Sequence, residues 1–139
     1  MVPVPALQAK LYAALTDPQR QSALHTPAYS MVSYAWGQRY QQSNQWAVEW
    51  MAGALERGVQ SRKQAQAWLR FKGYEPTTLK LGALTRLGGR VARANVAFDD
   101  HPNDKRFSDR IETVTVDSLW LWLPRAGLAS GPQVLAGGT

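Results

Sequence analysis

Apolar residues recur at helical spacing along the first part of this chain. Residues 5–15 carry a leucine at every fourth position, and the pattern ends at Asp17-Pro18. A proline in the first turn of a helix loses no hydrogen bond, so Pro18 can begin a second short helix that reaches Leu24. The segment 25–42 that follows has no regular period and is rich in Tyr, Ser and Gly, which predicts an ordered loop.

A third helix is predicted over residues 44–55. Its polar residues, Gln45 and Glu49 among them, fall away from the apolar side, and Gly58 provides a stop. We expect its two tryptophans to be buried rather than displayed for stacking on a sugar or a base. The apolar side consists of Trp46, Ala47, Trp50, Met51 and Ala54.

A fourth helix is predicted over residues 62–72 because both of its ends carry local signals. Ser61 can accept a hydrogen bond from the Gln64 amide, and the Gln64 side chain can reach back, which is a capping box. Gly73 stands where a left-handed residue ends a helix. The predicted buried side consists of Ala65, Trp68 and Phe71.

Shorter signals follow in the second half of the chain. Residues near 77–82 and 92–99 alternate apolar and polar positions on either side of a Gly-Gly break, which predicts two short strands of a small antiparallel sheet. The stretch "TVTVDSLWLWLP" fits a strand through its alternating Leu and Trp. Thr115 before the Leu and Trp run and Pro124 after it favour a short capped helix instead, and a helix is our prediction.

These elements predict one helix-rich α+β domain over residues 1–127. A chain of 139 residues with 45% apolar content can bury a core without disulfides or metal, and it contains no cysteine. The uncharged, glycine-rich residues 128–139 are expected to form a flexible C-terminal tail. No apolar run approaches the ~20 residues of a membrane span. The N-terminus lacks the pattern of a secretory signal, so the cytoplasm is the default expectation.

Charge is unevenly distributed within the formal total of +6. Residues 57–93 hold nine Lys or Arg against one Glu, a balance of +8, whereas residues 99–117 hold six acids against three basic residues, a balance of −3. The simpler explanation is that the basic segment is solvated or faces the acidic one. The alternative is a module that binds a polyanion, with nucleic acid the less favoured partner. That module would use Arg62, Lys63, Arg86, Arg90 and Arg93.

A cluster of acidic residues around His101 is a candidate for a hard metal ion. Asp99, Asp100 and Asp104 lie within three positions of it. Their spacing matches no established metal motif, and Asp, Asn and Pro together are typical of turns. The glycines of the chain form neither a dinucleotide-binding fingerprint nor a P-loop. We therefore expect no metal and no cofactor.

Three long stretches carry a more specific pattern. They read "YAWGQRYQQSNQWAVEWM", "AQAWLRFKGYEPTTLKLGALTRLGGRVARANVAFDDHP" and "RFSDRIETVTVDSLWLWL". Together, over residues 5–127, they resemble the C-terminal half of an uncharacterised bacterial family, domain of unknown function 2145. The resemblance implies that a partner is either a missing N-terminal half or a second copy that covers an exposed sheet edge.

That family is similar in turn to the permuted branch of the papain-like NlpC/P60 hydrolases and acyltransferases. In that branch a cysteine begins a helix and a histidine lies on an earlier strand. The family's helix start, Asn-Cys-Asn-Gln-Trp, corresponds to Gln42, Ser43, Asn44, Gln45 and Trp46. Ser43 therefore stands at the cysteine position and Gln42 at the position of the first asparagine. Its Ser-His-Ala-Gly strand has no counterpart here. The resemblance implies the cysteine-helix half of a permuted papain-like fold, inactive in this form, and a periplasmic or secreted location if the chain is a fragment.

The chemistry of Ser43 allows two interpretations. At the start of a helix, serine is a typical N-terminal cap. As a nucleophile it would need a general base within hydrogen-bond reach, because a helix N-terminus activates a thiolate but not a hydroxyl group on its own. His25 and His101 are the only histidines. We expect Ser43 to act as a cap in the nucleophile's position, without a working base.

Overall fold

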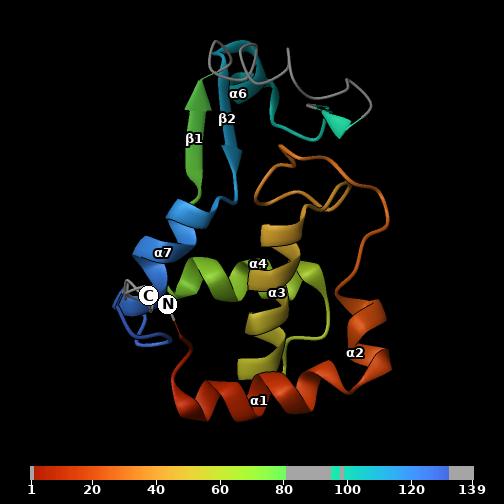
Figure 1. Cartoon of the computed structure of the whole chain (residues 1–139). Helices are drawn as coiled ribbons and strands as arrows, with labels where there is room; N and C mark the ends of the chain where they lie inside the picture. The colour runs from red at the N-terminus through yellow and green to blue at the C-terminus, as the bar shows by residue number, and fades with distance from the viewer. Residues whose placement is uncertain (1, 81–94, 98, 132–139) are drawn as a thin grey trace, which may run out of the picture.

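The computed structural model describes residues 2–80, 95–97 and 99–131. Along these residues four helices come first, and a two-stranded sheet with two more helices follows (Figure 1). This is the helix-rich α+β architecture with a small antiparallel sheet that the sequence predicted. The elements are α1 Pro5–Leu15, α2 Pro18–Ala23, α3 Ser43–Leu55, α4 Arg62–Phe71, β1 Thr77–Lys80, α6 Asn103–Phe107, β2 Arg110–Thr113 and α7 Val116–Arg125.

Helix α4 begins and ends at the predicted local signals. The Ser61 hydroxyl accepts a hydrogen bond from the Gln64 amide at 3.3 Å, as expected of a cap. The Gln64 side chain reaches back one residue further than predicted and accepts from the Gln60 amide at 2.8 Å. Gly73 has a φ of +69°, and the backbone hydrogen bonds around it close a Schellman motif. Both ends of α4 are therefore decided by neighbouring residues.

Helix α7 is present as predicted but extends beyond the expected stop. Thr115 and Ser118 form a capping box at its start. Pro124, predicted to follow the helix, lies inside its last turn. A proline there removes the hydrogen bond to the carbonyl of Trp120, and the helix ends instead at Arg125, followed by Ala126 as its cap and Gly127 with a φ of +69°.

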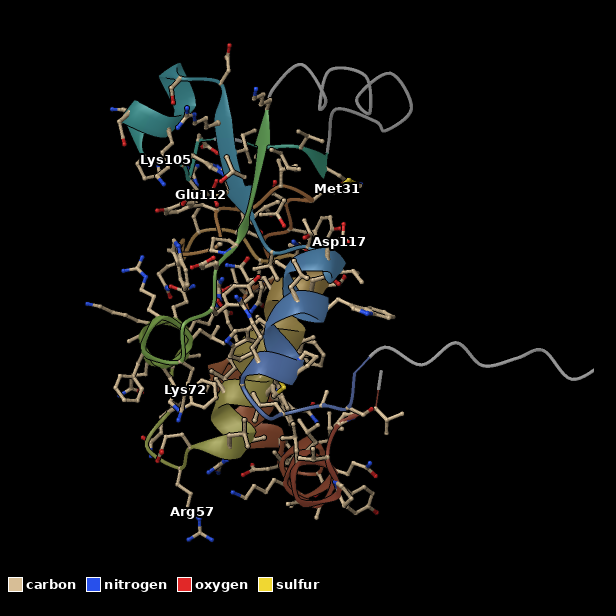
Figure 2. All side chains as sticks on the ribbon, turned by 90° about the vertical axis from the view of Figure 1, so that its left-hand side faces the viewer. Met31, Arg57, Lys72, Lys105, Glu112 and Asp117 are labelled. Atoms are coloured by element: carbon tan, nitrogen blue, oxygen red, sulfur yellow. The ribbon has the colours of Figure 1, made fainter. Side chains whose placement is uncertain are left out.

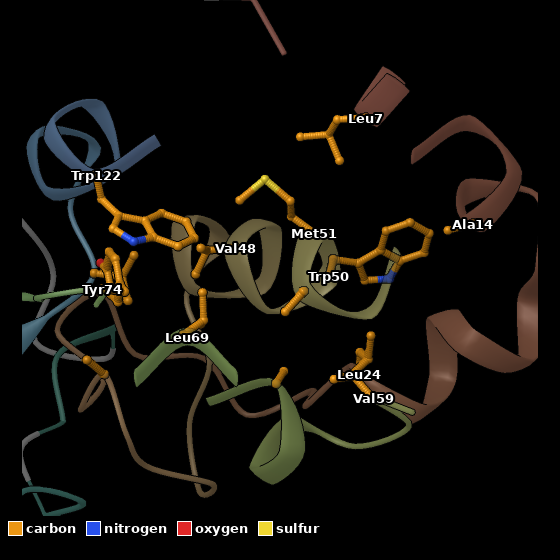
Figure 3. Close-up of a cluster of buried hydrophobic side chains, with 14 residues drawn as sticks. Leu7, Ala14, Leu24, Val48, Trp50, Met51, Val59, Leu69, Tyr74 and Trp122 are labelled. Atoms are coloured by element: carbon orange, nitrogen blue, oxygen red, sulfur yellow. The ribbon is translucent and has the colours of Figure 1, made fainter. Parts of the chain in front are cut away.

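The hydrophobic core is centred on α3, which packs against α1 and α4 (Figures 1 and 3). Trp50 is buried, and Trp46 and Trp68 are partly buried against the same cluster, which confirms their predicted packing. The Trp122 indole donates to the Lys72 carbonyl at 2.9 Å and fastens α7 to the end of α4. The buried cluster consists of Leu7, Ala14, Leu24, Ala35, Val48, Trp50, Met51, Ala52, Val59, Ala65, Leu69, Tyr74, Val114 and Trp122.

The faces of α3 and α4 differ from the predicted ones. Gln45 and Glu49 were placed on the polar side of α3, yet both are 0% exposed. Ala47 and Phe71 were placed on apolar sides, but Ala47 is exposed and Phe71 is 82% exposed. The reason is tertiary: the loop 25–42 covers the polar side of α3 and supplies hydrogen-bond partners there.

The sheet contains one predicted strand and one that the pattern missed. Strand β1 pairs antiparallel with β2, and Leu79 lies opposite Ile111. The second predicted strand, 92–99, is wrong where it is described, because residues 95–97 form no strand. Lys105 of α6 pairs with Glu112 of β2, and their side chains point toward one another in Figure 2.

The N-terminal segment is hydrogen-bonded to the segment that follows α7. Val4 donates to the carbonyl of Leu128 at 3.1 Å, and Ser130 donates to the carbonyl of Val2 at 3.0 Å. Residues 128–130, assigned to the tail by sequence, are thus hydrogen-bonded to the N-terminal segment. Residues 132–139 lie outside the described residues. None of the described helices is long and apolar enough to span a membrane.

Candidate functional site

The start of α3 is organised by Gln42 rather than by Ser43. The Gln42 side-chain oxygen accepts from the Asn44 amide at 3.2 Å, so Gln42 is the cap. Its side-chain nitrogen donates to the Val114 carbonyl and, at 3.3 Å, to the Thr113 hydroxyl. Ser43 already has helical geometry as the first residue of α3, and this is why it cannot cap the helix as predicted.

An open groove of about 750 Å³ lies at this helix start. We call it the α3 groove. Its walls come from α2, from the loop 25–42 and from the first turn of α3, which Figure 1 shows as neighbouring elements. Because these walls are brought together by the fold, the sequence pattern gave no sign of the groove. It is lined by Pro18, Gln21, Ser22, His25, Thr26, Pro27, Tyr29, Gln41, Gln42, Ser43 and Trp46.

Ser43 and His25 both line the α3 groove, whereas His101 does not. Ser43 and His25 are exposed side chains. Within the described part of the chain, no hydrogen bond joins Ser43 to either histidine, and the His101 ring is instead bonded to Asp100. The fold therefore places the Ser43 hydroxyl and the His25 imidazole in a single groove without the contact that activates a serine nucleophile.

Gln45 and Trp46, which also belong to the predicted helix-start motif, make different contacts. The Gln45 side chain donates to the carbonyls of Tyr34 and Ala35, at 3.1 and 3.2 Å, and accepts from the Ser33 hydroxyl at 2.7 Å. These bonds fasten the loop 25–42 to α3. Trp46 packs on Trp50 with 5.9 Å between ring centroids and forms part of the groove wall.

A buried polar network that the sequence did not reveal lies behind the groove. Glu49 and Arg62 are 0% and 4% exposed, and Arg62 Nε lies 2.7 Å from Glu49 Oε2. Gln41 and Gln66 donate to the same carboxylate at 2.7 and 2.6 Å. Burial raises the pKa of Glu49 above its ordinary value, while the hydrogen bonds from Arg62, Gln66 and Gln41 oppose that rise.

The Arg62 guanidinium holds the loop as well as the carboxylate. It donates to the backbone carbonyls of Gly37, Gln38 and Tyr40 at 3.1, 3.0 and 3.1 Å, and to the Thr26 hydroxyl at 2.9 Å. Thr26 and Gln41 belong to the groove wall, so the Glu49–Arg62 pair holds two groove residues in position. A planar, always-charged donor is suited to this many partners.

This burial corrects the predicted basic surface. Arg62 is an interior residue and cannot contact an external polyanion. Lys63 is exposed, and Arg57 and Lys72 extend from the surface in Figure 2. The remaining members of the predicted patch, Arg86, Arg90 and Arg93, lie outside the described residues.

The acidic residues near His101 are directed to separate partners. Asp99 pairs with Arg39 at 2.5 Å. Asp100 accepts from the Tyr34 amide at 2.8 Å and lies 3.0 Å from His101 Nδ1. Among residues 2–80, 95–97 and 99–131, no three His, Asp or Glu side chains are grouped as metal ligands would be.

Comparison with known proteins identifies a family but no function. A family model described as "Uncharacterized protein conserved in bacteria (DUF2145)" matches residues 1–123. No curated protein and no solved structure matches the chain.

Proposed function

This chain belongs to the DUF2145 family, and we propose that it is a ligand-binding protein whose site is the α3 groove. The observation that supports this proposal is the construction of the groove wall. Thr26 and Gln41 are held by the buried Glu49–Arg62 pair, and Gln42 is held by the turn before α7. A wall fixed before binding lowers the ordering cost that a ligand must overcome.

We further propose that the groove is the inactive counterpart of a permuted papain-like, NlpC/P60-type site, with Ser43 in the nucleophile position. The support is the placement of Ser43, exposed in the groove at the first residue of α3. A cysteine there would be stabilised as thiolate by the helix N-terminus. The Ser43 hydroxyl has no hydrogen-bonded base in the described structure, so the groove binds without hydrolysing.

Covalent labelling tests the inactive character of the site. The chain is treated with a serine-directed fluorophosphonate, and labelled positions are located by mass spectrometry, with Ser43→Ala as the control. We expect no labelling of Ser43. Stoichiometric labelling that disappears in the control would establish a serine hydrolase instead.

Binding itself is tested by amide NMR with a mixture of small neutral, cationic and anionic compounds. We expect the shifted amide signals to include those of His25, Thr26 and Ser43. Shifts confined to other parts of the chain would refute the α3 groove as the binding site.

A further inference from the structure

We propose that the ligand of the α3 groove is a neutral, hydroxyl-rich compound of the carbohydrate class. This inference rests on the proposed binding function of the groove and names its ligand class. It follows from the side chains that line the groove, from the hydrogen bonds those side chains already make, and from two aromatic rings in the lining, one exposed and one partly buried.

The first observation is the charge of the lining. In a chain in which 19% of the residues are charged, none of the eleven lining residues is Asp, Glu, Lys or Arg. The charged groups that hold the wall from behind, Glu49 and Arg62, are buried and paired with each other. Phosphates and carboxylates are normally bound by Arg or Lys and cations by carboxylates. The lining therefore favours a neutral ligand.

The second observation is which polar atoms remain available. Both ends of the Gln41 and Gln42 amides are used inside the protein. Gln21 uses its nitrogen on the Leu15 carbonyl and keeps its oxygen as an acceptor. Thr26 accepts from Arg62 and keeps its own hydroxyl proton to donate.

Ser22 uses its hydroxyl proton on the Gln19 carbonyl and keeps its oxygen as an acceptor. Ser43 and His25 add groups that both donate and accept hydrogen bonds. Neither side chain is hydrogen-bonded to another residue in the described structure. A sugar hydroxyl also donates and accepts, so it can pair with every one of these atoms. A backbone-like peptide ligand would instead need fixed donors and acceptors in alternation.

The third observation is the aromatic surface. Tyr29 is 46% exposed, and Trp46 is held in place by its contact with Trp50. Both line the groove together with two prolines. The face of a pyranose ring carries C–H groups and packs on such flat apolar surfaces, while its rim carries the hydroxyl groups. Apolar walls with a few oriented polar atoms are the usual composition of small-molecule sites.

The test is an amide NMR titration of the whole chain with neutral oligosaccharides: cellotriose, maltotriose and tri-N-acetylchitotriose. The comparison probes are cationic chitosan trimer, anionic trigalacturonate and the neutral peptide N-acetyl-trialanine amide. We expect at least one neutral oligosaccharide to saturate the signals of His25, Thr26 and Ser43. Its affinity should be the same at about 50 and about 300 mM salt, because no charge pair is formed.

Two variants test whether the aromatic side chains of the groove contact the oligosaccharide, and a third variant serves as their control. Trp46→Ala and Tyr29→Ala should each weaken oligosaccharide binding about tenfold, since each removes an aromatic face. Tyr29 is exposed, so its variant should keep the fold if Trp46→Ala does not. Trp120→Ala, an exposed tryptophan of α7 outside the groove, should leave binding unchanged.

The outcomes separate the ligand class from the site. Groove signals that respond only to a charged trimer or to the peptide would refute the carbohydrate class and leave the groove as a binding site. If the groove signals respond to none of these probes, the carbohydrate proposal is overturned. If they also do not respond to the mixture of small neutral, cationic and anionic compounds, the binding function is overturned.

Discussion

The Glu49–Arg62 pair gives the sharpest test of how this fold holds its groove. The perturbation is Arg62→Met, which keeps the length and apolar stem of the side chain but removes its charge and donors. Six hydrogen bonds are lost, two to Glu49, three to backbone carbonyls and one to Thr26. The Glu49 carboxylate then stays buried with only Gln41 and Gln66 as donors.

The magnitude follows from that burial. Removing one partner of a buried pair leaves an uncompensated charge and costs about 3–5 kcal/mol. A domain of this size has a free energy of unfolding of about 5–15 kcal/mol, so the loss is a large fraction of it. In urea, with an m value of about 1–3 kcal/mol/M, the midpoint should fall by roughly 2 M.

The assay is urea unfolding followed by far-ultraviolet circular dichroism, with Lys63→Met as the matched control. Lys63 is the next residue of α4 and is exposed, so its variant should stay within about 0.5 kcal/mol of the parent. The double variant Arg62→Met with Glu49→Gln should lose less than the sum of the single variants. An Arg62→Met variant within about 1 kcal/mol of the parent would refute the proposed clamp.

The same variant has a predicted pH dependence. Burial already raises the pKa of Glu49 above its ordinary 4.5, and loss of Arg62 removes the hydrogen bonds and charge that oppose this rise. The folded variant then binds a proton at a higher pH than the unfolded chain, so lowering the pH toward 4.5 stabilises the folded state. The deficit of Arg62→Met should therefore be largest above the folded pKa and smaller at about pH 5 than at about pH 7.5. An unchanged deficit would mean that the buried carboxylate is not its cause.

Gln42→Ala should lower the free energy of unfolding by about 1–2 kcal/mol, because it removes the α3 cap and a buried donor to Val114. Ser43→Ala should stay within about 0.5 kcal/mol of the parent. Urea unfolding compares the two variants, and a larger loss of stability in Ser43→Ala than in Gln42→Ala would show that Ser43 is the cap. Gly73→Ala should cost about 1 kcal/mol through backbone strain, since its φ is +69° although nothing lies within 4 Å of the added carbon; a thermal melt that matches the parent would contradict this. Burial raises the pKa of Tyr74 to about 12, so the folded chain keeps a proton that the unfolded chain releases above 10.0, and stability falls between these pH values. Tyr74→Phe should remove that part of the alkaline loss and one tyrosinate absorbance step; an unchanged alkaline profile would refute the assignment.

The elements that the sequence predicted correctly have their start and stop signals within a few residues of their ends. Ser61 and Gln64 mark the start of α4, Gly73 marks its end, and Thr115 marks the start of α7. Caps and left-handed glycines act through backbone groups one to five positions away, so a local pattern contains them. The same holds for the position of α3, whose start was displaced by one residue because Gln42 supplied the cap that serine usually supplies.

The candidate site was only partly predictable, because a local pattern does not show which distant segments meet in the fold. The sequence placed Ser43 at the start of a helix, but it could not place His25 in the same groove, because that depends on how the loop 25–42 returns to α3. Strand β2 was missed because four residues with two charges among them carry little signal until β1 lies beside them.

By itself the sequence determined where most helices form and where several of them start and stop. The tertiary structure decided which sides of those helices are interior. Glu49 and Arg62 have the polarity of surface residues, and periodicity alone assigns such residues to solvent. They are buried because each satisfies the other and because the loop 25–42 supplies the remaining partners. Burial of a charge depends on atoms that arrive from elsewhere in the chain, and only the folded chain brings those atoms together.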